Sequence, residues 1–393
     1  MAKDKPYYPH APIGSIAMLA KTLGVHPKLL ADLAGKSADS YTHFVVETKG
    51  GKLRNVYEPK YELKKLQKRI NSRLFEKVQF PHYLQGGVKD EVDPRDYIEN
   101  SRMHAGSEFL ISLDIRDFYD NIPFNSVFSV FKYFFKFPDD VSDLLSRIVT
   151  RDGKVPQGAC TSSYIANLIF FNSEYSFVSK LRAQGLVYSR LLDDVTVSAK
   201  RLLSQDEATA QIKYLAGLFS QHGLRIKRSK TKMERSDDLT AEYAVTGVWV
   251  GHGVPKLRRS ERDNIRHSVY ICECEYKRDC FSEEYHALWN KVSGQVAKLT
   301  RLEHAQAKKL RARMRSILPL YDSKTTAAII READRLLKRP RSTHTRVSIV
   351  DGYRKLINRL GILTRTNKDL ARGLRRQLKS KFSDVPSKAL MWE

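Results

Sequence analysis

The sequence predicts an α+β fold, in which strand-like and helical segments occupy different stretches of the chain. Two runs rich in β-branched and aromatic residues, 109–113 and 187–197, are typical of strands. Segments 61–75 and 260–276 instead repeat apolar residues at intervals of three and four, the spacing of an amphipathic helix. With 393 residues, the chain is long enough for two or three subdomains around a substantial core.

The charge balance indicates a polyanionic partner. Sixty-nine Lys and Arg face 44 Asp and Glu, which gives a net charge of +25. Neutralising phosphates releases their counterions, so nucleic acid is the first candidate partner and an acidic membrane surface the second. No apolar stretch approaches the ~20 residues that span a bilayer, and the N-terminus lacks the apolar core of a secretory signal. Four cysteines argue against a disulfide scaffold and favour the reducing cytoplasm.

Residues 1–40 are expected to form a small helical lobe. Leucines at helical spacing fill residues 15–34, and Gly and Pro at 24–27 divide them into two short helices. A helix-turn-helix that reads DNA is the alternative to a lobe that only packs.

Residues 41–57 are expected to form a β-hairpin, because a Gly-Gly pair separates two short β-type runs. The hairpin carries Lys49, Lys52 and Arg54. These cations suit a flexible arm that closes over a triphosphate. The alternative is a solvated basic edge that protects the strands from aggregation.

Three aspartates stand at the ends of apolar strand segments. Asp114 follows 109–113, and a carboxylate there is costly unless it is paired or binds a metal. Asp193 and Asp194 interrupt the second run, and a tight turn centred on them would bring both carboxylates to one point. Carboxylates from different strands around two Mg²⁺ ions support nucleotidyl transfer. The alternative is a plain turn whose aspartates bond their own backbone.

Between these strands, Pro156, Gln157 and Gly158 form a turn signal before a helix that starts with small and hydroxyl residues. The missing bulk lets another chain or a ligand approach closely. Gln157 would then touch a base or a sugar; otherwise it is only a turn residue.

The basic hairpin, the strand ending in Asp114, the Pro-Gln-Gly turn and the Asp-Asp hairpin occur in an order that resembles the fingers and palm of reverse transcriptases. The resemblance covers about residues 40–320. It implies a right-hand polymerase with a basic helical C-terminal extension. The implied divisions are fingers at 41–108, palm at 109–252 with a fingers insertion around 125–160, thumb at 253–337 and extension at 338–393.

Two short elements resemble the retron subgroup of bacterial reverse transcriptases. One is Asn-Ala-x-x-His, here with Ser101 in place of Ala, and the other is Val-Thr-Gly. In that family these elements accompany recognition of a dedicated structured RNA, and the corresponding residues are Asn100, His104, Val245, Thr246 and Gly247. The resemblance implies a cognate noncoding RNA that supplies both template and priming 2′-hydroxyl, an RNA-linked single-stranded DNA product, an effector protein and a role in antiphage defence.

One departure concerns the residues before the aspartate pair. The family usually has Tyr-Ala there, whereas this chain has Leu191 and Leu192. The metal-binding carboxylates are unaffected. Primer handling, fidelity or nucleotide preference are the properties in which a difference is expected.

The resemblance also implies roles for individual residues. Asp114, Asp193 and Asp194 would hold two Mg²⁺ ions. Tyr119 would be a steric gate that favours dNTPs over ribonucleotides. Arg54, Lys49 and Lys52 would bind the triphosphate, and Gln157 would support the nucleotide and template. Lys230 would donate a proton to pyrophosphate; its alternative is a solvated loop lysine.

Several alternatives stay open on the sequence. The chain would otherwise be a defence or mobile-element reverse transcriptase outside the retrons, or a catalytically silent RNA-binding scaffold. Segment 338–393 would bind RNA or a protein, or extend the thumb. A zinc site is disfavoured, because helical spacing places Cys272 and Cys274 on different faces.

Overall fold

The structure is a computed structural model that describes residues 4–48, 51 and 53–385. The chain divides into two compact units, the first ending at Lys256 and the second beginning at Leu257. Lys49 and Lys52 lie outside the described residues. Among the helices that the structure describes, none combines the length and the hydropathy needed to cross a lipid bilayer.

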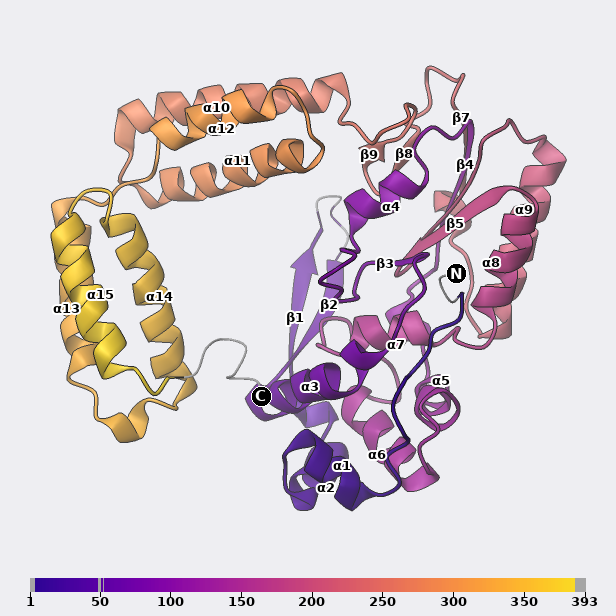
Figure 1. Cartoon of the computed structure of the whole chain (residues 1–393), viewed down its shortest axis with the longest axis horizontal. Helices are drawn as coiled ribbons and strands as arrows, with labels where there is room; N and C mark the ends of the chain where they lie inside the picture. The colour runs from indigo at the N-terminus through magenta and orange to yellow at the C-terminus, as the bar shows by residue number, and fades with distance from the viewer. Residues whose placement is uncertain (1–3, 49–50, 52, 386–393) are drawn as a thin grey trace. The chain divides into compact units, whose positions relative to one another are not determined.

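The first unit mixes strands with helices and confirms the predicted α+β class (Figure 1). Its strands are β1 (Tyr41–Glu47), β2 (Leu53–Pro59), β3 (Leu84–Gln85), β4 (Phe109–Asp114), β5 (Leu186–Leu191), β6 (Asp194–Ala199), β7 (Lys232–Arg235), β8 (Ala244–Val245) and β9 (Val248–Trp249). Its α-helices are α1 (Ile16–Leu23), α2 (Pro27–Gly35), α3 (Tyr61–Arg73), α4 (Tyr97–Met103), α5 (Phe124–Ser129), α6 (Asp139–Val149), α7 (Ser162–Leu168), α8 (Glu174–Ala183) and α9 (Gln205–Gln221). Shorter turns of helix are η1 (Ala38–Ser40), η2 (Phe75–Lys77), η3 (Tyr119–Asn121), η4 (Val130–Phe134) and η5 (Arg228–Lys230).

A five-stranded sheet in the order β3-β5-β6-β4-β7 forms the centre of this unit. β3 pairs with β5 in parallel, and the other neighbours are antiparallel. Figure 1 shows α8 and α9 beside one face of the sheet and α4 beside the other. Apolar residues of β4 and β6, such as Ile111 and Val197, belong to the core that α8 and α9 cover.

The same core extends to the N-terminal helices. Leu19, Leu23 and Leu30 of α1 and α2 are fully buried in it, together with residues of α3 and α6. The two predicted helices are therefore confirmed, and they pack as part of the first unit.

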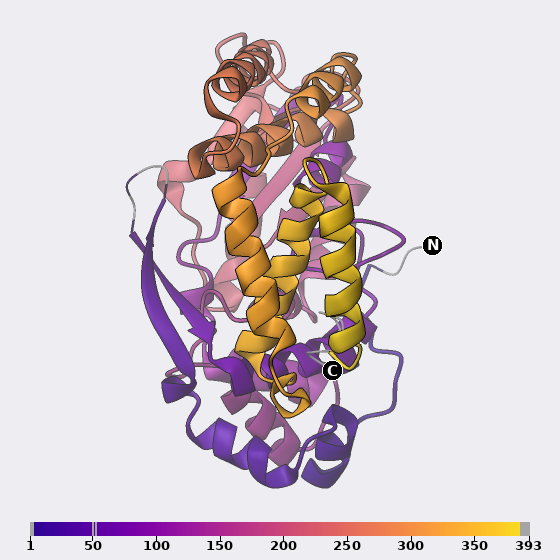
Figure 2. The same ribbon diagram turned by 90° about the vertical axis from the view of Figure 1, so that its left-hand side faces the viewer.

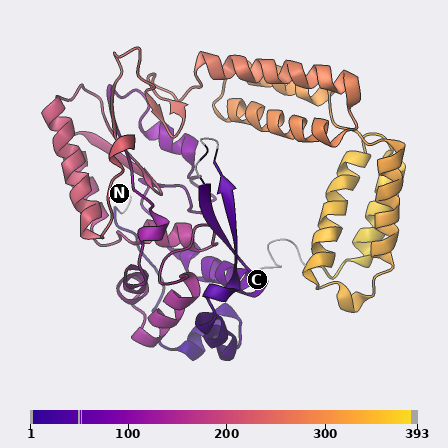
Figure 3. The ribbon, with the colours of Figure 1, turned by 180° about the vertical axis from the view of Figure 1, so that it is seen from behind.

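The second unit contains two helical cores. The first is shared by α10 (Arg259–Asp279), α11 (Glu283–Arg301) and α12 (Ala307–Ser316). The second is shared by α13 (Ser323–Leu337), α14 (Val347–Leu363) and α15 (Lys368–Lys381), with η6 (Arg341–Thr343) before α14. Figures 2 and 3 show α13, α14 and α15 side by side. The thumb at 253–337 and the extension at 338–393 stay predictions, although α13 packs with the helices that follow it.

Some local expectations differ from the structure. The helix predicted from residue 260 starts at Arg259 instead, with Arg258 as its N-cap, and it extends to Asp279. The basic stretch 298–315 is divided between two helices, because α11 ends at Arg301 and α12 begins at Ala307. Cys272 is buried in the core shared by α10, α11 and α12, whereas Cys274 is exposed.

Candidate active site

The aspartate pair lies at the tip of the β5–β6 hairpin, as predicted, but the turn is centred one residue earlier than expected. Leu191 pairs with Asp194, so Leu192 and Asp193 form the two-residue loop and Asp194 begins β6. Asp114, the last residue of β4, is the direct partner of Asp194 on the neighbouring strand. The amide of Ile115 donates to the carbonyl oxygen of Asp193 at 2.9 Å. The sheet therefore brings all three aspartates to one end.

A buried arginine that the sequence analysis did not single out supports this turn. Arg190 is fully buried and makes a bidentate ion pair with Glu174 of α8, at 2.6 and 2.9 Å. Its Nη1 also donates to the carbonyl oxygen of Leu192 at 3.2 Å. Leu192 has φ +59°, an unfavourable value for a branched side chain, so this bond helps to hold the turn. A charged residue within an apolar strand was the signal that could have revealed it.

The unusual leucines pack against a glycine pair. A Cβ atom on Gly86 would lie 2.9 Å from Leu191 Cγ, and one on Gly87 would lie 3.1 Å from Leu192 Cδ2. Both glycines have positive φ, and β3 joins this loop to β5. The backbone at Gly86 and Gly87 thus leaves the space that Leu191 and Leu192 occupy.

The carboxylates are crowded and partly desolvated. Burial, and then the neighbouring Asp193 and Asp114, raise the pKa of Asp194 to about 6. Burial also raises the pKa of Asp193. Lys230 of η5 donates to Asp114, and this bond raises the pKa of the lysine. The aspartates therefore carry more negative potential than one ammonium group offsets, which is a setting that favours a cation.

The donor set suits a hard divalent cation, because all three residues offer carboxylate oxygen. Within the described ranges, no three His, Cys, Asp or Glu side chains form a ready-made metal cluster. Asp114 instead directs its Oδ2 to Lys230. The three carboxylates are chemically suited to bind a divalent cation. The ammonium group of Lys230 occupies part of the space beside Asp114 that such a cation would take.

A cleft of about 500 Å³ joins the aspartates to the predicted nucleotide-binding residues. Asp114 and Asp193 line it together with Lys230. The other predicted site residues that line it are Arg54, Tyr119 and Gln157. Four further residues line the cleft but were not predicted from the sequence: Asn55, Asp117, Phe118 and Lys227. Their closeness in sequence to predicted site residues is the signal that could have revealed them.

Asp194 faces a different hollow of about 360 Å³. Lys230 lines both spaces, and the second one also includes Lys232 of β7 and Thr246. The aspartate pair thus lies between two recesses, with one carboxylate toward each.

Tyr119 is packed tightly beside the aspartates. Its ring lies next to Phe118, with centroids 5.8 Å apart. Burial, and then the charge of Asp193, raise the pKa of Tyr119 to about 12, so the phenol is neutral at physiological pH. A neutral, fixed ring at the cleft wall restricts the shape of a ligand.

The turn around Gln157 supports the β1–β2 hairpin. The carbonyl oxygen of Gln157 accepts from the amide of Tyr57 at 2.8 Å. Gly158 has φ +106°, and a Cβ atom there would lie 2.7 Å from Val56 Cγ1. The close approach predicted for this turn is therefore a contact with β2.

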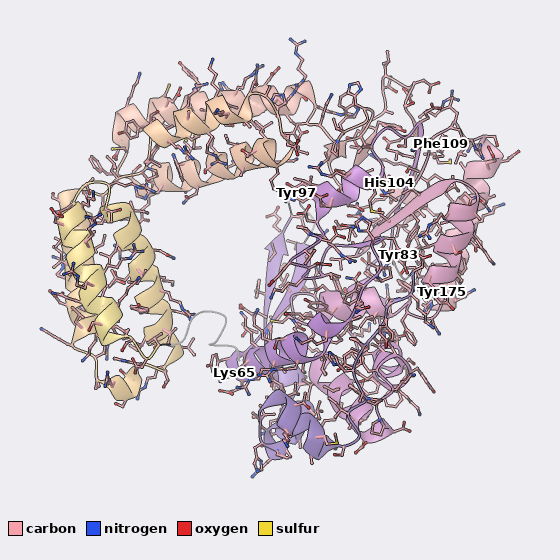
Figure 4. All side chains as sticks on the ribbon, in the orientation of Figure 1. Lys65, Tyr83, Tyr97, His104, Phe109 and Tyr175 are labelled. Carbon is pink, nitrogen blue, oxygen red and sulfur yellow. The ribbon has the colours of Figure 1, made fainter. Side chains whose placement is uncertain are left out.

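The predicted RNA-recognition residues Asn100 and His104 are buried, and Figure 4 labels His104 at the end of α4. His104 is 1% exposed and bonds Ser198 of β6 at 2.8 Å and Ser189 of β5 at 2.7 Å. Burial lowers the pKa of His104 to about 3. Asn100 is fully buried, and its amide atoms have no hydrogen-bond partner among the described residues. His104 thus ties the C-terminal end of α4 to strands β5 and β6, and the part that Asn100 and His104 play in RNA recognition stays a prediction.

The Val-Thr-Gly element forms the turn of the β8–β9 hairpin and lies against α4. Thr246 and Gly247 are the two loop residues, with φ of +48° and +74°. Thr246 Oγ1 donates to the carbonyl oxygen of Tyr97 at 2.8 Å, which helps to hold its strained backbone. Val245 is buried with Leu110 in a small separate core. The two elements, far apart in sequence, are neighbours in the fold.

Strand β4 and the β5–β6 hairpin bring three aspartates together, and the β1–β2 arm and Tyr119 meet them at one cleft, which is the arrangement of a right-hand polymerase. The family model for reverse transcriptase (RNA-dependent DNA polymerase) matches residues 46–259. The retron Se72 reverse transcriptase of Salmonella heidelberg is 42% identical over 384 residues, which cover 97% of this chain and 100% of the relative. Two Escherichia coli relatives are the retron Ec48 enzyme, 33% identical over 84% of this chain and 82% of its own, and the retron Ec86 enzyme, 27% identical over 60% and 70%.

The chain belongs to the reverse transcriptase family, and within it to the retron type. It is an RNA-directed DNA polymerase, with RNA as template and DNA as product, of a family that uses divalent metal ions. The similarity extends further than the 40–320 expected from motifs, because the Salmonella relative aligns over almost the whole chain.

Proposed function

We propose that this reverse transcriptase copies one cognate structured noncoding RNA, which supplies the template and the priming 2′-hydroxyl, into RNA-linked single-stranded DNA. The observation that carries this proposal is the shared position of α4 and the β8–β9 turn, the two elements that resemble the retron subgroup. In recognition of the RNA, Val245, Thr246 and Gly247 would contribute through that turn. Asn100 and His104 would act by positioning α4.

Asp114, Asp193 and Asp194 would hold two Mg²⁺ ions in this scheme. The bound ions would supply Lewis-acid activation of the primer hydroxyl and neutralise charge on the triphosphate. Lys230, already bonded to Asp114, would donate a proton to the leaving pyrophosphate. The recess that includes Asp194 and Thr246 would receive the primer end.

The cleft residues would select and orient the nucleotide. Arg54 would bind the triphosphate, and Lys49 and Lys52 would assist from the same arm. Gln157 would support the nucleotide and template. Tyr119 would exclude a ribose 2′-hydroxyl, because its ring is held by burial at the cleft wall.

An associated effector protein and a role in antiphage defence complete the proposal, by analogy with retrons. The four free cysteines fit a reducing cytoplasm. The basic surface of α13, α14 and α15 would contact the RNA or the effector.

Sequencing of nucleic acid that co-purifies with the chain tests the cognate RNA. We expect an RNA–DNA species joined through a 2′-linkage and encoded beside the gene. Primer extension on a generic RNA template with Mg²⁺ separates the enzyme from a silent scaffold. Extension with ordinary linear primers only, and no linked species, would favour a reverse transcriptase outside the retrons.

Comparison of dNTP and rNTP incorporation tests the gate. The Tyr119→Ala substitution is expected to raise the ratio of rNTP to dNTP incorporation about 10- to 100-fold, because it removes the ring that would clash with the 2′-hydroxyl. Phe118→Ala removes the neighbouring ring and serves as a control for packing damage. Unchanged selectivity in Tyr119→Ala would remove the gate assignment.

A further inference from the structure

A second cavity lies beside the catalytic cleft and has no assigned role. It has a volume of about 740 Å³, and its walls come from the end of β4, helix α9 and residues 224–229. Four cationic side chains line it, against a single carboxylate, Asp117. The cationic residues are Arg116, Arg225, Lys227 and Arg228. The cavity is therefore suited to a small, highly charged anion.

Most of this positive charge is available to a ligand. Arg116 pairs with Asp117, with Nε and Oδ2 3.4 Å apart. Across residues 4–48, 51 and 53–385, no carboxylate lies within ion-pair distance of Arg225, Lys227 or Arg228. Surface cations without partners are common, but three that converge on one cavity have a shared purpose in an enzyme whose substrates are phosphates.

The backbone fixes these cations next to the catalytic strand. Ile226 pairs with Ile115, the amide of Arg116 donates to the carbonyl oxygen of Arg225 at 2.8 Å, and the amide of Lys227 donates to that of Asp114 at 2.7 Å. Arg225 and Lys227 are two residues apart on an extended segment, so their side chains leave it on the same side. A rigid frame thus joins the cavity to the metal-binding end of β4.

The cavity also adjoins the cleft. Asp117 and Lys227 line both spaces. No aromatic side chain is among the residues that line the cavity, so it offers no stacking surface for a nucleobase. The hydroxyl groups of Ser220 and Ser229 add neutral hydrogen-bonding groups. These features fit an anion without a base that comes from the cleft.

We propose that this cavity binds pyrophosphate after each nucleotide addition. In that step the primer hydroxyl oxygen gives its proton to solvent water and bonds to the α-phosphorus, the α–β phosphoanhydride bond breaks, and pyrophosphate leaves with the bonding electrons on its oxygen. Arg225, Lys227 and Arg228 then draw the anion from the cleft, which opposes the reverse reaction. The inference rests on the proposed assignment of Asp114, Asp193 and Asp194 to the metal site beside the cleft.

Direct binding of inorganic pyrophosphate to the full chain tests the proposal. Titration calorimetry without metal ions compares the unmodified chain with Arg225→Gln and Arg228→Gln. Each loss of a charge-assisted contact is expected to raise the dissociation constant about 5- to 10-fold. Lys213→Gln, which removes a positive charge from exposed α9 outside the cavity, is the matched control and is expected to change nothing.

A kinetic measurement identifies the source of the anion. In primer extension with Mg²⁺, the cavity variants are expected to slow pyrophosphate release several-fold, followed with a coupled phosphate assay, while KM for dNTP stays unchanged. A raised KM with unaltered pyrophosphate binding would assign the cavity to the incoming triphosphate and overturn the proposal. So would a loss of duplex binding, which would make the cavity a nucleic-acid surface.

Failure of the cleft assignment is distinguishable from failure of this inference. Pyrophosphate binding by the metal-free chain does not depend on catalysis. Asp193→Asn should lose extension but keep binding in the cavity. Normal extension by Asp193→Asn would refute the cleft, whereas equal pyrophosphate affinity of the Arg225→Gln, Arg228→Gln and unmodified chains would refute the cavity.

Discussion

Two hairpins of the first unit differ in how the fold holds them. β5–β6 lies inside the five-stranded sheet, with β3 paired to one edge and β4 to the other. β1–β2 forms a two-stranded sheet of its own, as Figure 2 shows, and Phe44, Val46 and Leu53 on it are 40%, 43% and 66% exposed. The buried hairpin can keep two carboxylates at a fixed place, while the exposed one is free to adjust along most of its length. The comparison predicts that changes in β5–β6 affect the chemical step and changes in β1–β2 affect nucleotide binding.

The largest expected effect is loss of a carboxylate from the buried hairpin. Asp193→Asn or Asp194→Asn should reduce primer extension at least ~10³-fold, because each change removes a proposed metal ligand at the point where charge would develop. RNA binding should stay nearly intact, since the change removes a crowded charge from the turn. Steady-state extension and a filter-binding assay measure the two properties. Asp206→Asn on exposed α9 is the control, and comparable loss in it would remove the assignment.

The second prediction concerns the histidine beneath the buried hairpin. Burial lowers the pKa of His104 to about 3, below the usual 6.5, so the unfolded chain binds a proton that the native chain does not. Its contribution to stability is present above pH 6.5 and is lost as pH falls toward 3. At pH 5 the loss is about 2 kcal/mol, from one and a half pH units at about 1.4 kcal/mol each.

His104→Gln cannot titrate, so its free energy of unfolding should change less between pH 7 and pH 5 than that of the unmodified chain. Urea titrations at the two pH values measure this. His43→Gln on the exposed hairpin is the matched control and should keep the full pH dependence. An identical pH dependence in His104→Gln would show that another group titrates.

The sequence predicted more of the buried hairpin than of its support. Apolar runs and interrupting aspartates were enough to place Asp114, Asp193 and Asp194 on strand ends. The turn was displaced by one residue, because register depends on pairing partners rather than on local pattern. Arg190 and Glu174 were not predicted to meet, since they are on different elements and their contact is fixed by tertiary packing.

The exposed hairpin and the RNA-recognition element show another limit. The sequence indicated the β1–β2 hairpin correctly, but it left open whether another chain or a ligand approaches the turn at 156–158, and in the structure Val56 of β2 lies against Gly158. His104 was identified through the resemblance to retron enzymes. That resemblance implies a role for the residue but does not indicate that its side chain is buried. The local sequence pattern predicts the helix or strand to which a residue belongs. It does not predict which side of that element is buried by tertiary packing.

The third prediction tests the exposed hairpin directly. Arg54→Gln should raise KM for dNTP about 10-fold and change the maximal rate little, because it removes a charge-assisted contact with the triphosphate made before and during the reaction. Arg73→Gln, at an exposed position of α3, is the control for lost positive charge. A fall in maximal rate with constant KM would place Arg54 in the chemical step and weaken the division between the hairpins.

The smallest effect is expected at the base of the exposed hairpin, where the turn at Gly158 supports β2. A Cβ atom there would lie 2.7 Å from Val56 Cγ1 and 3.2 Å from the carbonyl oxygen of Tyr57, at φ +106°. Gly158→Ala should displace β2 and raise KM for dNTP about 3- to 5-fold, since such strain costs on the order of 1–3 kcal/mol and the hairpin can shift to relieve part of it. Gly153→Ala is the matched control, because Gly153 also has positive φ, +73°, but its Cβ would meet nothing within 4 Å. Equal effects of the two substitutions would mean that backbone strain alone, rather than contact with β2, determines nucleotide binding.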